Sequence, residues 1–141
     1  MEIKKILVSV CGNSVDEEAV KLACYLARKN KAQVYVLYVI EVPRTLPLDA
    51  QIDSEIQKAD DLLTCTEDIA TDQDYEIETD LLQAREAGPG IVDEAMERKI
   101  DLIIMGIPYK KRLGIFDQGN VSRYVLRESP CPVLLYREQI P

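Results

Sequence analysis

The sequence contains one loop whose residue types suit the binding of a phosphate group. Gly106 ends an apolar run, Gly119-Asn120 starts a predicted helix, and between them lie the basic residues Lys110, Lys111 and Arg112. Helix N-termini present N–H groups and partial positive charge, which favours bound anions. The loop is longer than the roughly two to six residues usual between a strand and a helix, and long loops of this kind are often functional. This segment therefore suggests recognition of one small phosphorylated ligand.

The same loop also allows a purely structural interpretation. The sequence has neither GxxxxGK[ST] nor GxGxxG, the standard phosphate-binding motifs. Gly106 would then only end a strand, Gly119-Asn120 would only cap a helix, and the basic run would form a solvated surface. The residues alone leave both interpretations open.

Side chains that support catalysis are scarce. The chain has no histidine, which excludes Ser-His-Asp and Cys-His catalysis and histidine-ligated zinc. Its four cysteines show no CxxC spacing, so neither a zinc ribbon nor a dithiol motif is predicted. Cys11 lies between a predicted strand and a predicted helix, where thiols become more reactive; a small packing residue is the alternative to a redox role. We expect a protein that is not an enzyme, with no catalytic residue and no metal site.

Charge and hydropathy exclude further classes of protein. The 141 residues include 17 Lys+Arg and 25 Asp+Glu, which gives a net charge of −8. Binding to nucleic acid depends largely on neutralising phosphates, so we expect no nucleic-acid partner. No apolar run approaches the roughly 20 residues of a membrane span, and residues 1–6 lack the pattern of a signal peptide. We expect a cytoplasmic protein with no membrane partner.

The elements that position the candidate residues follow from alternating apolar and amphipathic segments. Five apolar runs predict strands at residues 6–10, 34–40, 75–82, 102–105 and 133–136. Amphipathic segments predict helices between them, the first opened by Ser14 and Glu17 at the spacing of a capping box. This alternation predicts an α/β fold, an open parallel sheet of five strands with helices on both faces. We expect the strand order 3-2-1-4-5. We expect a single domain over residues 1–141.

The predicted site lies at one edge of this sheet. Ligands of open parallel sheets bind beyond the carboxyl ends of the strands, where the strand order reverses. Two loops are predicted to meet there, residues 11–14 after the first strand and residues 106–118 after the fourth, and each leads into a helix N-terminus.

The sequence resembles the universal stress protein family along its whole length. The resemblance is carried by ILVSV at the start, LYVIEV, Gly88-Pro89, DLIIMG and the closing SPCPVLLYR. Many members carry a G-x2-G-x9-G-[S/T] motif after the fourth strand that wraps the phosphates and ribose of ATP. Here Gly106 and Gly119 keep the spacing of that motif, but Tyr109 replaces its second glycine and Asn120 its hydroxyl residue.

The resemblance implies which residues would hold a nucleotide. Phosphates would lie at Gly106, Gly119, Asn120 and Val121, and the base near Ser9, Cys11 and Val39, with Met105 and Tyr109 completing the candidate set. Cys11 stands where the family has an aspartate that contacts adenosine, and Ser9 stands where proline is common. Losing a hydrogen bond to a charged group costs about 1.5–3 kcal/mol, and Tyr109 resists the close backbone approach that glycine allows.

These departures predict a stress-response module with a degenerate ATP pocket, which binds an adenine nucleotide weakly or not at all. The alternative is a competent ATP or AMP sensor in which Lys110, Lys111 and Arg112 neutralise the phosphates. An interaction protein that keeps only a vestigial pocket is a further interpretation. Nucleotide bound to the purified protein would distinguish a binding module from an interaction protein.

The last strand is predicted to form an edge of the sheet. Its residues are Val133, Leu134, Leu135 and Tyr136, and an exposed apolar edge favours pairing with another chain. In the family this strand pairs with its own copy across a two-fold axis. The resemblance therefore implies a homodimer with these four residues at the interface.

Overall fold

A twisted sheet of five parallel strands forms the centre of the molecule. The computed structural model describes residues 1–109, 111–112, 115–116 and 119–140. The sheet order is β3-β2-β1-β4-β7, which confirms the predicted fold class and strand order. The strands are β1 (Lys5–Val10), β2 (Gln33–Glu41), β3 (Glu78–Ala84), β4 (Leu102–Ile107) and β7 (Val133–Arg137), the last being the predicted fifth strand.

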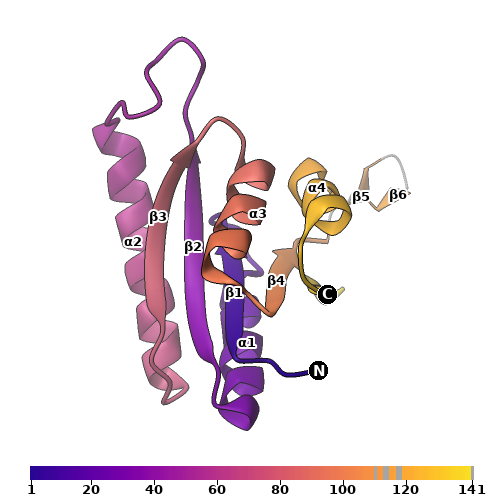
Figure 1. Cartoon of the computed structure of the whole chain (residues 1–141). Coiled ribbons are helices and arrows are strands. Elements are labelled where there is room, and N and C mark those ends of the chain that lie inside the picture. The colour runs from indigo at the N-terminus through magenta and orange to yellow at the C-terminus, as the bar shows by residue number, and fades with distance from the viewer. Residues whose placement is uncertain (110, 113–114, 117–118, 141) are drawn as a thin grey trace.

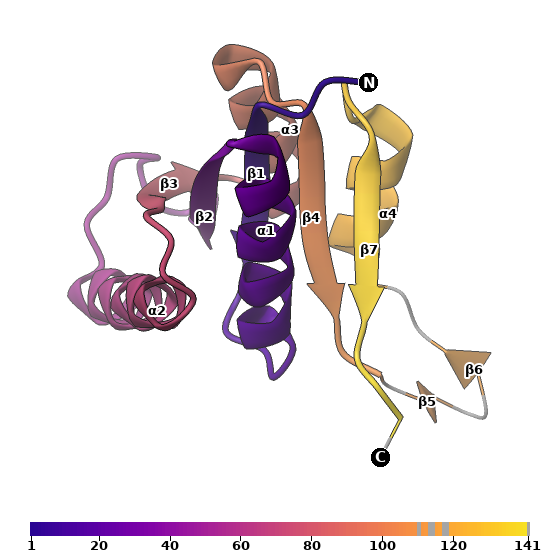
Figure 2. The same ribbon diagram turned by 90° about the horizontal axis from the view of Figure 1, so that it is seen from below.

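Helices cover both faces of this sheet. Figures 1 and 2 show α1 (Asp16–Asn30) and α2 (Asp53–Asp72) on one face, and α3 (Ala87–Arg98) and α4 (Asn120–Glu128) on the other. Each pair of helices encloses its own hydrophobic core, with α1 and α2 over one cluster and α3 and α4 over the other. No helix in the described part of the chain is long and apolar enough to cross a membrane.

The apolar strands of the sequence become the central strands because both of their faces are buried. In β1, Ile6 and Val8 point into the core under α1 and α2, whereas Leu7 points into the core under α3. In β4, Ile103 and Ile104 divide in the same way, and both are fully buried. Side chains of a strand alternate between the two faces, so a strand covered on both sides must be apolar throughout.

The third strand begins later than predicted, at Glu78 rather than Tyr75. The Tyr75 hydroxyl donates a hydrogen bond to the carbonyl oxygen of Ala32. Tyr75 and Ile77 pack against the core under α1 and α2. These residues therefore anchor the connection from α2, and strand pairing with β2 starts only beyond them, at Glu78 opposite Tyr35.

The predicted capping box at the start of the first helix is wrong. The helix begins at Asp16, and its cap position, Val15, makes no side-chain cap hydrogen bond. Ser14 instead donates its hydroxyl to the carboxylate of Glu138, at 2.9 Å. A capping serine must accept an N–H of the first turn, and here the serine side chain is turned toward the C-terminal segment of the chain.

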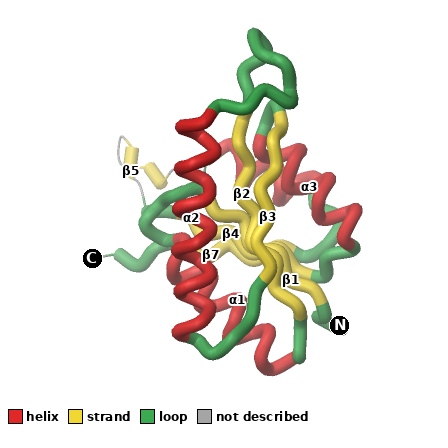
Figure 3. Tube along the Cα trace, turned by 90° about the vertical axis from the view of Figure 1, so that its left-hand side faces the viewer, coloured by secondary structure: helices red, strands yellow, loops and turns green. Residues whose placement is uncertain are grey.

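Two connections extend beyond the sheet at its carboxyl edge. The β2–α2 connection rises above the strands in Figure 3 and is held by Arg85, which donates to the carbonyl oxygens of Pro43 and Leu46 at 2.7 and 2.8 Å. After β4, the short strands β5 (Lys111–Arg112) and β6 (Ile115–Phe116) pair antiparallel within the predicted long loop. Lys110 lies outside the described residues.

Candidate functional site

A cavity of about 300 Å³ lies where the strand order reverses, beyond the carboxyl ends of β1 and β4. The nucleotide-binding residues proposed from the sequence line it, with the exception of Tyr109. They are Ser9, Cys11, Val39, Met105, Gly106, Gly119, Asn120 and Val121. The fold therefore brings together residues from four separate parts of the chain.

The inner wall of this cavity is built by the strand ends. Ser9 of β1 is the register partner of Met105 of β4, because these two strands pair side by side. Val39 of β2 and Ile91 of α3 add apolar surface. A concave, largely apolar wall with a few polar groups at its edge is typical of a small-molecule site and suits a flat ring system.

The loop between β1 and α1 is organised by the carboxylate of Asp16. One oxygen, Oδ2, accepts the backbone N–H groups of Cys11, Gly12 and Asn13, at 3.2, 2.7 and 3.1 Å. Burial raises the pKa of the Asp16 carboxyl, and the bonds from Gly12, Cys11 and Asn13 oppose that rise. In this loop, a carboxylate of the chain already holds the N–H groups that could hold a ligand anion.

Tyr109 is not among the residues that line the cavity and instead belongs to a cluster at its rim. Its backbone N–H donates to Oε2 of Glu138 at 3.0 Å, and its ring lies 5.0 Å from the guanidinium of Arg137. The other oxygen of Glu138 accepts the Ser14 hydroxyl. Sequence analysis did not single out Glu138, which follows the last strand and is held there by its own N–H bond to the carbonyl oxygen of Ile107, at 2.8 Å.

The start of α4 forms the opposite side of the cavity. Gly119 adopts a φ of 89°, a conformation that favours glycine, and the described residues leave open space where a side chain would begin. The Asn120 side chain accepts a hydrogen bond from Arg123 at 2.7 Å. The structure thus places one cation of α4 near this helix start. The side chains of Lys111 and Arg112 lie outside the described part of the chain, as does Lys110, so their predicted contact with phosphate stays a prediction.

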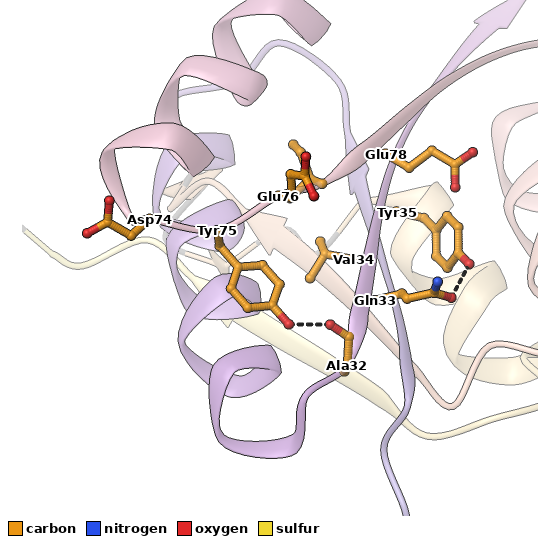
Figure 4. Close-up of a pocket in the computed structure, with 9 residues that line it drawn as sticks. Ala32, Gln33, Val34, Tyr35, Asp74, Tyr75, Glu76 and Glu78 are labelled. Atoms are coloured by element: carbon orange, nitrogen blue, oxygen red, sulfur yellow. Dashed lines mark hydrogen bonds between the residues drawn. The ribbon is translucent and has the colours of Figure 1, made fainter.

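A second, larger hollow of about 570 Å³ lies at the opposite end of the strands, beside the amino ends of β2 and β3. Figure 4 shows its lining, where Tyr75 reaches toward Ala32 and the Tyr35 hydroxyl donates to Gln33 at 2.7 Å. Three carboxylates surround it, those of Asp74, Glu76 and Glu78. It also lies beside the carboxyl end of α2, where the helix dipole is negative. Such surroundings repel phosphate, so the smaller cavity fits the predicted phosphorylated ligand better than this hollow does.

The predicted dimer strand occupies an edge of the sheet. β7 pairs with β4 on one side and is the last strand in the sheet order, and it forms the margin of the five-stranded sheet in Figure 2. Its residues Val133, Leu134, Leu135 and Tyr136 are half-buried. The strand is therefore available for pairing, and the homodimer itself stays a prediction.

Comparison with known proteins gives consistent matches. The model of the Universal stress protein family matches residues 2–137. A universal stress protein of Methanocaldococcus jannaschii is 32% identical over 141 residues, which cover 96% of this chain and 82% of the relative. A solved universal stress protein from Archaeoglobus fulgidus is 29% identical, with a TM-score of 0.76, covering 96% of this chain and 94% of the other. A universal stress protein from Archaeoglobus fulgidus in complex with dAMP is 26% identical, with a TM-score of 0.76, covering 96% and 98%.

Proposed function

Because this chain belongs to the universal stress protein family, as its sequence resemblance predicted, we propose that it is a stress-response module with an adenine-nucleotide pocket between β1 and β4. The pocket is degenerate on its phosphate side, so ATP binds weakly. The module performs no catalysis, acts in the cytoplasm and works as a homodimer joined through β7.

The observation that carries the proposal is the cavity at the reversal of strand order. It gathers the apolar ends of β1, β2 and β4 at one wall and the start of α4 at the other. An apolar wall suits an adenine ring, and a helix start suits a phosphate. The solved relative from Archaeoglobus fulgidus in complex with dAMP supports an adenine ligand for this fold.

The degeneracy of the pocket is argued from Tyr109 on the phosphate side and from Cys11 on the adenosine side. Glycine at position 109 would let the backbone approach a phosphate, whereas the Tyr109 N–H donates to Glu138. Cys11 offers no charged acceptor at the end of β1, where the family has an aspartate. Each change removes a contact that the family motif provides, and a lost hydrogen bond to a charged group costs about 1.5–3 kcal/mol.

The proposal is tested with a variant in which a bulky side chain fills the opening of the cavity. Cys11 is an exposed residue of the cavity lining, so Cys11→Trp fills the opening without disturbing the core. The matched control is Cys65→Trp, an equally bulky change at an exposed cysteine on α2. Calorimetric titration with AMP is expected to give binding for wild type and for the control, and none for Cys11→Trp. Equal affinity of AMP for all three proteins would refute the pocket.

The alternative function is a competent ATP sensor. The same titration, carried out with both AMP and ATP, distinguishes it from the degenerate pocket. If Lys110, Lys111 and Arg112 neutralise the phosphates, ATP binds at least as tightly as AMP, and replacing these three residues by Ala weakens ATP selectively. The degenerate pocket predicts the opposite order, with ATP the weaker ligand.

A further inference from the structure

Carboxylates of the chain already hold backbone N–H groups at three of the loops that border the cavity. Asp16 holds the loop between β1 and α1. Glu41 accepts the N–H of Ala87 at 2.9 Å, at the start of α3. Glu138 accepts the N–H of Tyr109 at 3.0 Å, after β4. N–H groups at loop ends and helix starts are the usual places for a bound anion, and in these three loops the anion is part of the protein.

The start of α4 is different, because the chain places a cation there. Arg123 donates to Oδ1 of Asn120 at 2.7 Å. Gly119, Asn120 and Val121 line the cavity beside it. An anionic group of a ligand that enters the cavity is therefore drawn to α4 and repelled by the loops that carry Asp16, Glu41 and Glu138.

The size of the cavity limits how much of a ligand it encloses. About 300 Å³ lies at the lower end of the range of small-molecule sites, so a long phosphate chain must pass over the rim. Asn13, in the loop after β1, and Pro108, directly after β4, both line the cavity. The residues that follow them, Ser14 and Tyr109, are bridged by Glu138. Glu138 therefore places a carboxylate on that stretch of the rim, where an emerging phosphate chain would pass, with the Arg137 guanidinium beside it against the Tyr109 ring.

We propose that Glu138 is the specificity-determining residue of this pocket. Given the adenine-nucleotide site proposed above, the pocket accepts a nucleoside monophosphate, with its phosphate at the start of α4. It disfavours the triphosphate because the added phosphates meet the Glu138 carboxylate. Like charges brought together at a binding surface weaken the complex and so select against that ligand.

Glu138 suits this role better than Asp16. Asp16 is 5% exposed and holds three N–H groups, so its replacement disturbs the loop itself. Glu138 makes one bond to Ser14 and one to Tyr109, from the segment that follows β7. A glutamine at position 138 keeps both partners, because its oxygen accepts the Tyr109 N–H and its amide donates to the Ser14 hydroxyl oxygen. Only the charge is lost.

Calorimetric titration of the full chain with AMP and with magnesium-free ATP tests the proposal. Wild type is expected to bind AMP about tenfold or more tightly than ATP. Glu138→Gln is expected to strengthen ATP binding about tenfold and to leave AMP binding within about twofold. The control Glu128→Gln removes the same charge from the far end of α4, where Glu128 contacts Arg127, and is expected to change neither ligand.

The outcomes separate this proposal from the function on which it rests. An unchanged ratio of AMP to ATP affinity in Glu138→Gln overturns the role of Glu138 and leaves the nucleotide pocket standing. The same holds if Glu128→Gln changes the ratio as much as Glu138→Gln, since the effect then comes from net charge. Absence of binding of both nucleotides to wild type and to Glu138→Gln overturns the pocket and this proposal together.

Discussion

Gly106 and Val15 lie so close that a Cβ atom on Gly106 would come within 2.7 Å of a methyl carbon of Val15. Gly106 is near the end of β4, and Val15 precedes the first turn of α1. The glycine therefore lets the start of α1 pack against the strand end that forms one wall of the cavity. This close packing explains a glycine here without any contact to a ligand.

Gly106→Ala is expected to lower the free energy of unfolding by about 1–3 kcal/mol, the usual cost of an overpacked core. The paired change Val15→Ala removes the methyl groups that cause the clash. In a double-mutant cycle measured by chemical denaturation, the double variant should lose less stability than the two single losses added together, by about 1 kcal/mol. Simple additivity would show that the contact between these residues is not the reason for the glycine.

Asp16 is expected to be the residue that fixes the loop between β1 and α1. Asp16→Ala leaves the N–H groups of Cys11, Gly12 and Asn13 without their acceptor and should cost about 2–3 kcal/mol of unfolding free energy. Asp16→Asn keeps an oxygen in the same place and should cost less. Hydrogen exchange of these three amides should rise more in the alanine variant than in the asparagine variant. Equal exchange in the two variants would contradict the assignment.

The fold and the place of the cavity could be predicted from the sequence because local patterns determine both. Apolar runs such as 102–105 mark strands buried on both faces, and their alternation with helices predicts a parallel sheet whose site lies beyond the carboxyl ends of the strands. The rim could not be predicted in this way. Ser14 and Glu138 are 124 residues apart in the chain, and their contact arises only when β7 takes its place beside β4. The spacing of Ser14 and Glu17 suggested a local cap, but the distant partner holds the serine hydroxyl.

Cys24 gives a prediction for alkaline pH. This thiol is fully buried, and burial raises its pKa, with nearby Arg28 opposing the rise. In the unfolded chain a thiol ionises at about pH 8.5. The folded protein holds the proton more tightly, so the stabilising contribution is complete below about pH 8.5 and is lost as the pH rises toward the folded pKa.

The measurement is the free energy of unfolding by urea at several values between pH 7 and pH 10. Wild type is expected to lose more stability than Cys24→Ala over that range, by about 1.4 kcal/mol for each unit of pKa difference between folded and unfolded chain. Cys131, which also titrates here, is present in both proteins and cancels in the comparison. Parallel pH profiles would contradict the assignment.

The proposed homodimer predicts a particle of about twice the chain mass of 16.0 kDa in light scattering at micromolar concentration. Tyr136→Arg places a like charge in both copies of a symmetric contact at β7 and should shift the protein toward monomer. Leu126→Lys, at an exposed position of α4, is the control and should leave the mass unchanged. A wild-type mass near that of one chain, or a fully dimeric Tyr136→Arg, would count against pairing through β7.

The central claim is that an adenine nucleotide occupies the smaller cavity, at the reversal of strand order. The most direct measurement is the change in backbone amide chemical shifts when AMP is added to ¹⁵N-labelled protein. We predict that the largest shifts occur at Ser9, Met105 and Val121, which line that cavity. The claim would be contradicted if the largest shifts occurred at Gln33, Tyr75 and Glu76, which line the larger hollow at the amino ends of β2 and β3. A spectrum that AMP leaves unchanged would also contradict it.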